Sequence, residues 1–253
     1  MSTPSIVAPT RSIPSPSSAQ SGAAPAPFKD ATRMLTSLLA PAEKRALLWL
    51  AVRLPRWVQS DHLTALALVA MIGAGASYWL ASATPVGLAL ACVCLFVNWF
   101  GDSLDGTLAR VRQQPRPRYG FYVDHVVDLF GAAFLLGGLA LSGYMSPAVA
   151  IALLVAYLML CVEVFLATHS LGTFHMSYFK IGPTELRILL ALGNVAVIFH
   201  PRATLFEHSF LAFDVGAVVG VIGLLATLLY ATVSHTRTLY RLEPLPPPPS
   251  GAR

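Results

Sequence analysis

Long runs of apolar residues constrain the fold of this chain more than any other feature of its sequence. A helix that crosses a bilayer needs about 20 mostly apolar residues. Six runs approach or exceed that length, although the fifth is the shortest and needs some extension. We therefore expect an all-α membrane bundle of six transmembrane helices. The expected spans are Leu63–Ser82, Val86–Ala109, Tyr122–Leu141, Pro147–Thr168, Leu186–Phe199 and Leu211–Val233.

The scarcity of charged residues supports a membrane domain. Charged residues make up 11% of the 253 and hydrophobic ones 55%, with a mean hydropathy of +0.64. A soluble domain carries about 25% charged residues, so the composition indicates a multi-spanning membrane protein. The Pro/Ser/Ala-rich start is expected to be disordered, and it lacks the pattern of a signal peptide. The expected regions are a disordered tail over 1–27, juxtamembrane helices over 28–60, the membrane domain over 61–236 and a Pro-rich tail over 237–253.

The segment Phe28–Trp57, which precedes the first span, alternates apolar residues with basic ones. This pattern predicts one or two amphipathic helices that lie on the membrane surface, with a solvated helical linker as the alternative. The basic residues of the segment are Lys29, Arg33, Lys44, Arg45, Arg53 and Arg56.

Basic residues also orient the expected spans. Of the 17 Lys and Arg residues, all but Arg202 fall on one side of the membrane. Under the positive-inside rule that side is the cytoplasm, and it holds both termini. The net charge of +5 does not require nucleic acid, because it suits an anionic leaflet and anionic substrates. The compact size indicates a bacterium, so we expect a multi-pass protein of the bacterial inner membrane.

Four aspartates lie within 27 residues of a chain that otherwise avoids charge. Asp102 and Asp105 have i, i+3 spacing, and Asp124 and Asp128 have i, i+4 spacing, so each pair shares one face of its helix. An ionisable residue inside a membrane is costly and indicates a functional site. Four bare anions cannot share a medium of low dielectric, so they bind cations or some are protonated. Ion pairs or helix caps are the structural alternative.

The ligand chemistry of four carboxylates favours hard divalent cations. Oxygen ligands suit Mg²⁺, Mn²⁺ or Ca²⁺ rather than Zn²⁺. Four carboxylates can hold two such ions about 3.5–4 Å apart, which is the arrangement used in phosphoryl displacement. The sequence therefore predicts a site that acts on a phosphate or pyrophosphate.

Small and basic residues accompany the aspartates. Gly106 and Ala109 fall within the same arc of about 100° as the first aspartate pair, where they allow a ligand to approach the backbone. Arg110 ends the same helix and is suited to bidentate contact with phosphate. Gly120 and Asp124 begin the next helix, which antiparallel packing is expected to bring alongside. The arginines expected to add positive potential at the mouth of the site are Arg110, Arg112, Arg116 and Arg118.

The pattern D-x2-D-G-x2-A-R, a nine-residue spacer and G-x3-D-x3-D resembles the signature of the CDP-alcohol phosphotransferase superfamily. Every position of the signature is matched. The segment Trp57–Thr64 also looks like the family's usual entry into its first span. The resemblance implies that a CDP-linked alcohol is cleaved at its pyrophosphate by the hydroxyl of a second alcohol, with CMP leaving, in phospholipid synthesis.

The resemblance also implies roles for individual residues. Two Mg²⁺ or Mn²⁺ ions would be held by the aspartates, and Asp128 would also deprotonate the attacking hydroxyl. The nucleotide would lie against the small residues, with its phosphates near Arg110. Family members are commonly homodimers, so we expect one here. The implied metal ligands are Asp102, Asp105, Asp124 and Asp128, and the implied nucleotide-binding residues include Gly106, Ala109, Arg110 and Gly120.

Two branches of the superfamily differ in the alcohol that carries CDP. His125 and the pair Thr184-Glu185 resemble the branch that uses CDP-choline or CDP-ethanolamine and a lipid hydroxyl, with His125 and Glu185 as further bases. Lys180 and Arg187 instead suit a water-soluble acceptor that carries phosphate. The length of the chain also favours the second branch, which takes CDP-diacylglycerol, and we place that branch first.

Other classes of protein are consistent with charge in a membrane. A non-catalytic protein that binds lipid or a partner has no need for all four carboxylates. A cation transporter would use the aspartates as its ion site, but Gly106, Ala109 and Arg110 suit a nucleotide better than a permeating ion.

Overall fold

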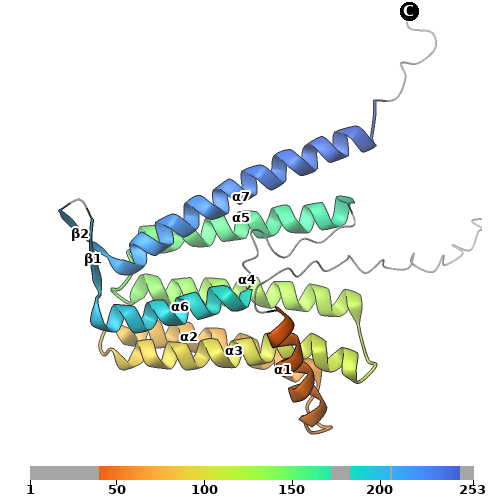
Figure 1. Cartoon of the computed structure of the whole chain (residues 1–253), viewed down its shortest axis with the longest axis horizontal. Helices are drawn as coiled ribbons and strands as arrows, with labels where there is room; N and C mark the ends of the chain where they lie inside the picture. Colours follow the sequence, from red (N-terminus) through yellow and green to blue (C-terminus); the bar gives the residue numbers. More distant parts are fainter. Residues whose placement is uncertain (1–39, 172–182, 206, 246–253) are drawn as a thin grey trace, which may run out of the picture.

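The computed structural model describes residues 40–171, 183–205 and 207–245. This part of the chain is almost entirely helical, with one β-hairpin between the last two helices (Figure 1). Long apolar runs form helices because a helix satisfies its own backbone groups without water. The elements are α1 (Ala40–Arg53), α2 (Ser60–Ala81), α3 (Val86–Val111), α4 (Pro117–Leu141), α5 (Pro147–Leu171), α6 (Pro183–Phe199), β1 (Arg202–Leu205), β2 (His208–Leu211) and α7 (Ala212–Leu242).

Five described helices are long and apolar enough to cross a membrane: α2, α3, α4, α5 and α7. They confirm the all-α membrane bundle and indicate a multi-pass integral membrane protein. The fifth expected span, Leu186–Phe199, corresponds to α6, which has 17 residues and is shorter than each of the other five helices. The helices extend past several expected bounds, most of all α7, which continues to Leu242.

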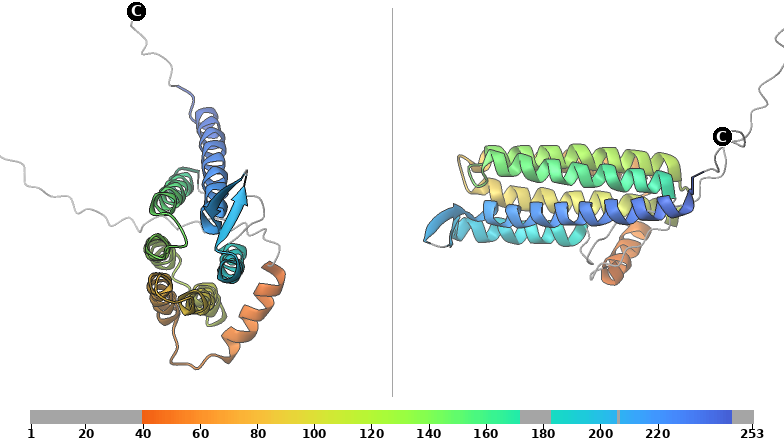
Figure 2. Two further views of the ribbon diagram at one scale, coloured as in Figure 1. Left: turned by 90° about the vertical axis from the view of Figure 1, so that its left-hand side faces the viewer. Right: turned by 90° about the horizontal axis from the view of Figure 1, so that it is seen from above.

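The six helices from α2 to α7 form a ring in which each packs against its neighbours. Around the ring the order is α2, α4, α5, α7, α6 and α3, which in turn packs against α2 (Figure 2). Helix α1 packs obliquely against the outside of α3, toward the end of the bundle opposite the hairpin (Figure 1). Because α3 and α4 both pack mainly against α2, side chains from these two helices meet across the ring and not at a shared helix–helix contact.

Helices α2 and α4 cross in close contact through glycine. A Cβ atom added at Gly138 would overlap the backbone carbonyl oxygen of Gly75, and one added at Gly75 would overlap that of Phe134. Small residues of this kind let helix backbones approach each other in a membrane. This crossing fixes the position of α4, which carries two of the four aspartates.

Gly138→Ala is expected to lower the free energy of unfolding by about 1–3 kcal/mol, since the added methyl group meets backbone and no flexible side chain. The matched control is Gly137→Ala, because a Cβ at Gly137 has open space around it. Thermal unfolding in detergent measures both variants. Equal stability of the two would contradict the close crossing.

Helix α6 is tied to the ring by buried polar side chains. The Tyr78 hydroxyl donates to Asn194 Oδ1 at 2.8 Å, and Asn194 Nδ2 lies 3.4 Å from Cys92 Sγ. Asn194 is fully buried, where an unpaired amide would be costly. These contacts join the middle of α6 to α2 and α3.

The hairpin between α6 and α7 is not predicted from the apolar runs. Its strands are antiparallel, with Arg202 opposite Leu211 and Leu205 opposite His208. Glu207, in the connecting turn, has a φ of 66°, the left-handed conformation that a tight turn requires. The hairpin leads the chain directly into α7.

Helix α1 covers only part of the expected juxtamembrane segment, because residues 28–39 lie outside the described residues. Leu47 and Ala51 are buried against the bundle, whereas Trp49 and Val52 are exposed. Apolar side chains therefore lie on both sides of α1. A position on the membrane surface stays a prediction.

Candidate active site

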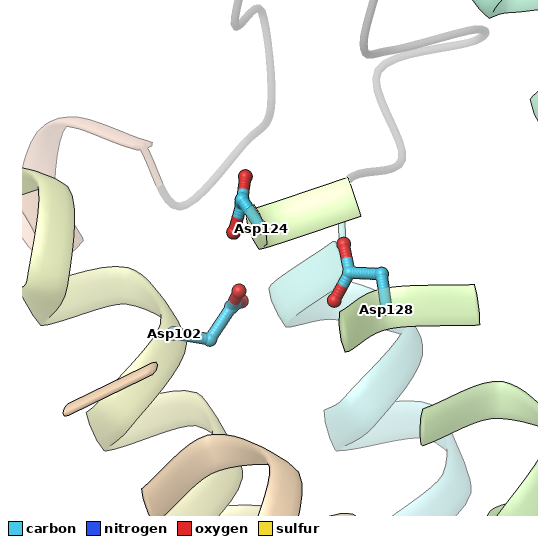
Figure 3. A group of neighbouring side chains, drawn as sticks. All are labelled: Asp102, Asp124 and Asp128. Atoms are coloured by element: carbon cyan, nitrogen blue, oxygen red, sulfur yellow. The ribbon is translucent and has the colours of Figure 1, made fainter. Parts of the chain in front are cut away.

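Three aspartates from two helices meet inside the ring. Carboxylate oxygens of Asp102 on α3 and of Asp124 and Asp128 on α4 lie within 4.8 Å of one another (Figure 3). The i, i+4 spacing places the two α4 side chains on one helix face, and Asp102 points toward them. We call these three residues the aspartate cluster.

Arg187 on α6 brings a positive charge to the aspartate cluster. Its Nη2 donates to Asp102 Oδ2 at 2.6 Å, and its Nε donates to Asn98 Oδ1 at 2.8 Å. The Arg187 side chain is only 16% exposed. Its third nitrogen, Nη1, is buried and has no hydrogen-bond partner among the described residues.

Asn98 is a site residue that the sequence reasoning missed. Its Nδ2 donates to the Ala67 carbonyl oxygen at 3.1 Å, which turns its Oδ1 toward Arg187. Asn98 precedes Asp102 by one helical turn, so the two residues share a face. A polar residue in an apolar run, four positions before an aspartate, is the signal that would have found it.

Asp105 lies outside the aspartate cluster and faces α2. Its Oδ2 accepts a hydrogen bond from the Thr64 hydroxyl at 2.6 Å, and its carboxylate also meets the Gly106 N–H. Ser60 donates to the Asp105 carbonyl oxygen at 3.0 Å. Asp105 therefore joins α3 to the start of α2, and its part in binding a cation stays a prediction.

The residues assigned to the nucleotide lie toward the α1 end of α3 and α4. The Arg110 guanidinium lies over Gly106, where an added Cβ would come 3.4 Å from Nη1. Arg110 Nη2 also donates to the Thr107 hydroxyl at 3.2 Å. Gly120 is exposed, with open space where a Cβ would be. Ala109 lines a hollow of about 340 Å³ together with Gln59, Ser60, Asp61, Leu108, Arg112, Gln114, Pro115 and Arg116.

Of the four arginines near the mouth of the site, Arg112 contacts the loop between α1 and α2, and Arg116 contacts the first turn of α2. Arg112 donates to the Pro55 carbonyl oxygen at 2.8 Å and also to that of Val58. Arg116 pairs with Asp61, and this hydrogen bond raises the pKa of the Arg116 guanidinium, which stays charged. Asp61, Arg112 and Arg116 are thereby held in the lining of the hollow.

His125 lies beside the aspartate cluster and packs between aromatic rings. Its Nδ1 lies 2.6 Å from the Phe121 carbonyl oxygen, so Nδ1 carries a proton and donates it there. The ring centroid lies 4.1 Å from that of Phe121 and 5.1 Å from that of Phe165. His125 Nδ1 is 3.8 Å from Asp124 Oδ2.

The remaining predicted site residues, Glu185 and Lys180, lie at the start of α6 and just before it in the chain. Glu185 lies in the first turn of α6, two residues before Arg187. Thr184, its neighbour, donates its hydroxyl to Glu43 of α1 at 2.7 Å. Lys180 lies outside the described residues.

The chemistry of the aspartate cluster fits a divalent cation. If all three carboxylates were ionised, the Arg187 guanidinium would compensate only one of their charges in this partly buried site, so a cation or a proton has to offset the others. Hard oxygen donors at short separations suit Mg²⁺ or Mn²⁺. The residues present therefore match the donor set that such an ion requires.

A family model described as CDP-alcohol phosphatidyltransferase matches residues 57–231, which is more than half of the chain. The matched segment begins just before α2 and ends within α7, so it contains the aspartate cluster, Asp105 and Arg187. No curated protein matches the chain.

Proposed function

The chain belongs to the CDP-alcohol phosphatidyltransferase family, whose members transfer substituted phosphate groups, and we propose that it moves a phosphatidyl group from CDP-diacylglycerol to a small alcohol. Membership supports a membrane transferase of phospholipid synthesis that takes a CDP-alcohol and an acceptor alcohol. The observation that carries the finer proposal is the unpartnered, buried Nη1 of Arg187 beside the aspartate cluster.

The reaction exchanges one phosphorus–oxygen bond for another. The acceptor hydroxyl oxygen bonds to the phosphorus that carries diacylglycerol, the bond from that phosphorus to CMP breaks, and CMP keeps the electron pair. The hydroxyl proton passes to Asp128, whose carboxylate lies in the aspartate cluster. Divalent ions, held by the cluster and Asp105, would neutralise the pyrophosphate and stabilise the leaving group.

The nucleotide half of the donor is assigned to the α1 end of the ring. Gly106 and Ala109 are small residues that would let the cytidine approach the backbone of α3, and Gly120 has open space beside it at the start of α4. The Arg110 guanidinium, already held over Gly106, is positioned for a phosphate oxygen.

The contacts of Arg187 support the proposal that the acceptor alcohol carries a negative charge. Its Nε and Nη2 are engaged by Asn98 and Asp102, and leaving the buried Nη1 unpaired is costly. A phosphate oxygen of the acceptor would satisfy it, with Lys180 as a second cation. This proposal favours acceptors such as glycerol phosphate or inositol phosphate over neutral alcohols.

The alternative, transfer from CDP-choline or CDP-ethanolamine to diacylglycerol, is supported by His125. With Nδ1–H donated to the Phe121 carbonyl, Nε2 is the basic nitrogen of the ring. A base beside the aspartate cluster suits deprotonation of a lipid hydroxyl, and Glu185 is the second candidate base.

A substrate panel on purified protein in detergent tests the proposed function. CDP-diacylglycerol is paired with glycerol phosphate, inositol phosphate or serine, and CDP-choline or CDP-ethanolamine is paired with diacylglycerol. Release of CMP is the readout. CMP release only in the choline or ethanolamine arm would replace the first proposal by the alternative, and none in any arm would refute both.

We also propose that α6 crosses the bilayer, that both termini are cytoplasmic in a bacterial inner membrane, that α1 lies on the membrane surface and that the enzyme is a homodimer. Single cysteines at Gln114, Glu207 and Glu243, in a background without native cysteines, test the crossing with an impermeant maleimide. Six spans place only Glu207 outside, whereas five spans place only Glu243 outside.

Light scattering in detergent tests the dimer, and vesicle binding by Trp49 fluorescence tests α1.

A further inference from the structure

One carboxylate oxygen of α1 accepts hydrogen bonds from two helices of the ring. Glu43 Oε1 receives the Trp99 Nε1–H at 2.8 Å and the Ser103 hydroxyl at 3.2 Å, both from α3. It also receives the Thr184 hydroxyl of α6 at 2.7 Å. Hydrogen bonds to an ionised acceptor are about twice as strong as neutral ones. Glu43 thus joins α3 to α6 from outside the ring.

The donors to Glu43 lie next to residues of the aspartate cluster and its arginine. Ser103 directly follows Asp102 on α3, and Thr184 precedes Arg187 by one helical turn on α6. The hydrogen bond from Arg187 to Asp102 therefore lies close to two of the groups that Glu43 holds. Movement of the first turn of α6 away from α3 would separate Arg187 from Asp102.

Helix α1 is itself held in place by packing. Leu47 and Ala51, on the same helix as Glu43, are buried in a cluster with Leu63, Leu104 and Leu108. Because α1 packs against α3 from outside the ring (Figure 2), Glu43 reaches α3 and α6 from a fixed support. Leu47 follows Glu43 by four positions, so the two lie on one face of α1.

We propose that Glu43 is a positioning residue, which holds the first turn of α6 against α3 so that Arg187 reaches Asp102. The proposal concerns the site assigned under the proposed function, but the contact it describes exists without any substrate. Glu43 acts through Thr184, and Arg187 is the group whose place it sets. If Glu43 only fixed α1 to the bundle, Arg187 would keep its place without it. The affinity of the site at Asp102 for a cation would then be unchanged in a Glu43 variant.

Binding of Mn²⁺ alone separates these two roles. A cation at the aspartate cluster shares Asp102 with Arg187, and the two positive charges repel each other. Arg187→Ala is therefore expected to tighten Mn²⁺ binding by about tenfold. Thr184→Val removes the hydroxyl without changing charge or volume, and it is expected to tighten binding by about threefold, because it lets Arg187 move away.

The test is a titration of purified full-length protein with Mn²⁺, followed by the electron paramagnetic resonance signal of the free ion. Thr184→Ser keeps the hydroxyl and is expected to bind as the unmodified protein does. Glu43→Gln keeps an acceptor oxygen but loses the charge that strengthens its hydrogen bonds, so it is expected to tighten Mn²⁺ binding less than Thr184→Val does. In an Arg187→Ala background, Thr184→Val and Glu43→Gln are expected to have no further effect. Glu243→Gln, an exposed site beyond α7, is the matched control.

Unchanged or weaker Mn²⁺ binding in both Thr184→Val and Glu43→Gln would overturn the positioning role. So would an equal change in the Arg187→Ala background, since Glu43 would then act without Arg187. Thr184→Val keeps the proposal open to refutation even where a substitution at Glu43 unfolds the protein. A failed substrate panel with the expected Mn²⁺ pattern would refute the proposed function and leave the positioning role standing.

Discussion

Asp128→Asn is expected to lower CMP release by at least about 1,000-fold while the bundle remains folded. Asparagine keeps the shape of the side chain but removes its charge, so it is a poor cation ligand and cannot accept the proton of the attacking hydroxyl. Both losses fall on the same step of the reaction. Initial rates of CMP release in detergent, with the substrate pair that the panel identifies, measure the effect.

The matched control for Asp128→Asn is Asp214→Asn, in the first turn of α7. Asp214 Oδ1 accepts the Ser146 N–H at 2.8 Å, and the asparagine oxygen can still accept it. The control is expected to keep its activity and its unfolding temperature. More than a tenth of the normal rate in folded Asp128→Asn would contradict the role of Asp128.

Asp105→Asn decides between two roles for a residue that lies outside the aspartate cluster. If Asp105 only joins α3 to Thr64, the amide oxygen keeps that hydrogen bond and most of the activity survives. If Asp105 is instead a cation ligand, asparagine lacks the charge that binds the cation, and CMP release is lost. We expect loss of activity, because the resemblance to the family pattern assigns a metal to this position.

Removal of divalent cations with EDTA is expected to stop CMP release completely, and Mg²⁺ or Mn²⁺ is expected to restore it. The aspartate cluster sets three carboxylates against the single guanidinium of Arg187, and the proposed substrate adds a pyrophosphate. Without a cation these charges repel each other across a partly buried site. A rate that EDTA leaves unchanged would rule out a cation in the reaction.

The cation is also expected to stabilise the folded protein. A ligand that binds only the folded state at 100 times its Kd stabilises it by about 2.7 kcal/mol. Thermal unfolding in detergent, with and without Mn²⁺, measures this shift. Asp102→Asn is expected to abolish it, whereas Asp214→Asn is expected to retain it. A shift that survives Asp102→Asn would place the cation elsewhere.

The helices and the family were predictable from local patterns. Apolar runs predict the all-α membrane bundle because a spanning helix satisfies its own backbone groups, and the family model confirms the resemblance of the aspartate pattern. The i, i+4 spacing predicts that Asp124 and Asp128 share a face. The bounds were less predictable, because α3 and α4 continue beyond their apolar runs into polar segments.

The partners of the site residues were not predictable in the same way. The i, i+3 spacing predicted that Asp105 lies beside Asp102. In the structure one carboxylate oxygen of Asp105 accepts a hydrogen bond from Thr64 of α2. The aspartates that lie close to Asp102 come from α4 instead. The hairpin before α7 was missed because its strands are short and carry no strong alternating pattern. Asn98 and Glu43 were missed because their partners are far away in the chain.

The sequence by itself determined the class of fold, the family and the helix faces that carry the aspartates, because these depend on residues within a few turns of one another. Only the tertiary structure decided that Asp102, Asp124 and Asp128 converge while Asp105 faces α2. It also decided that Arg187 reaches Asp102 and that Glu43 joins α3 to α6. The physical reason is that these contacts join residues up to 141 positions apart, and the order of helices around the ring places them together.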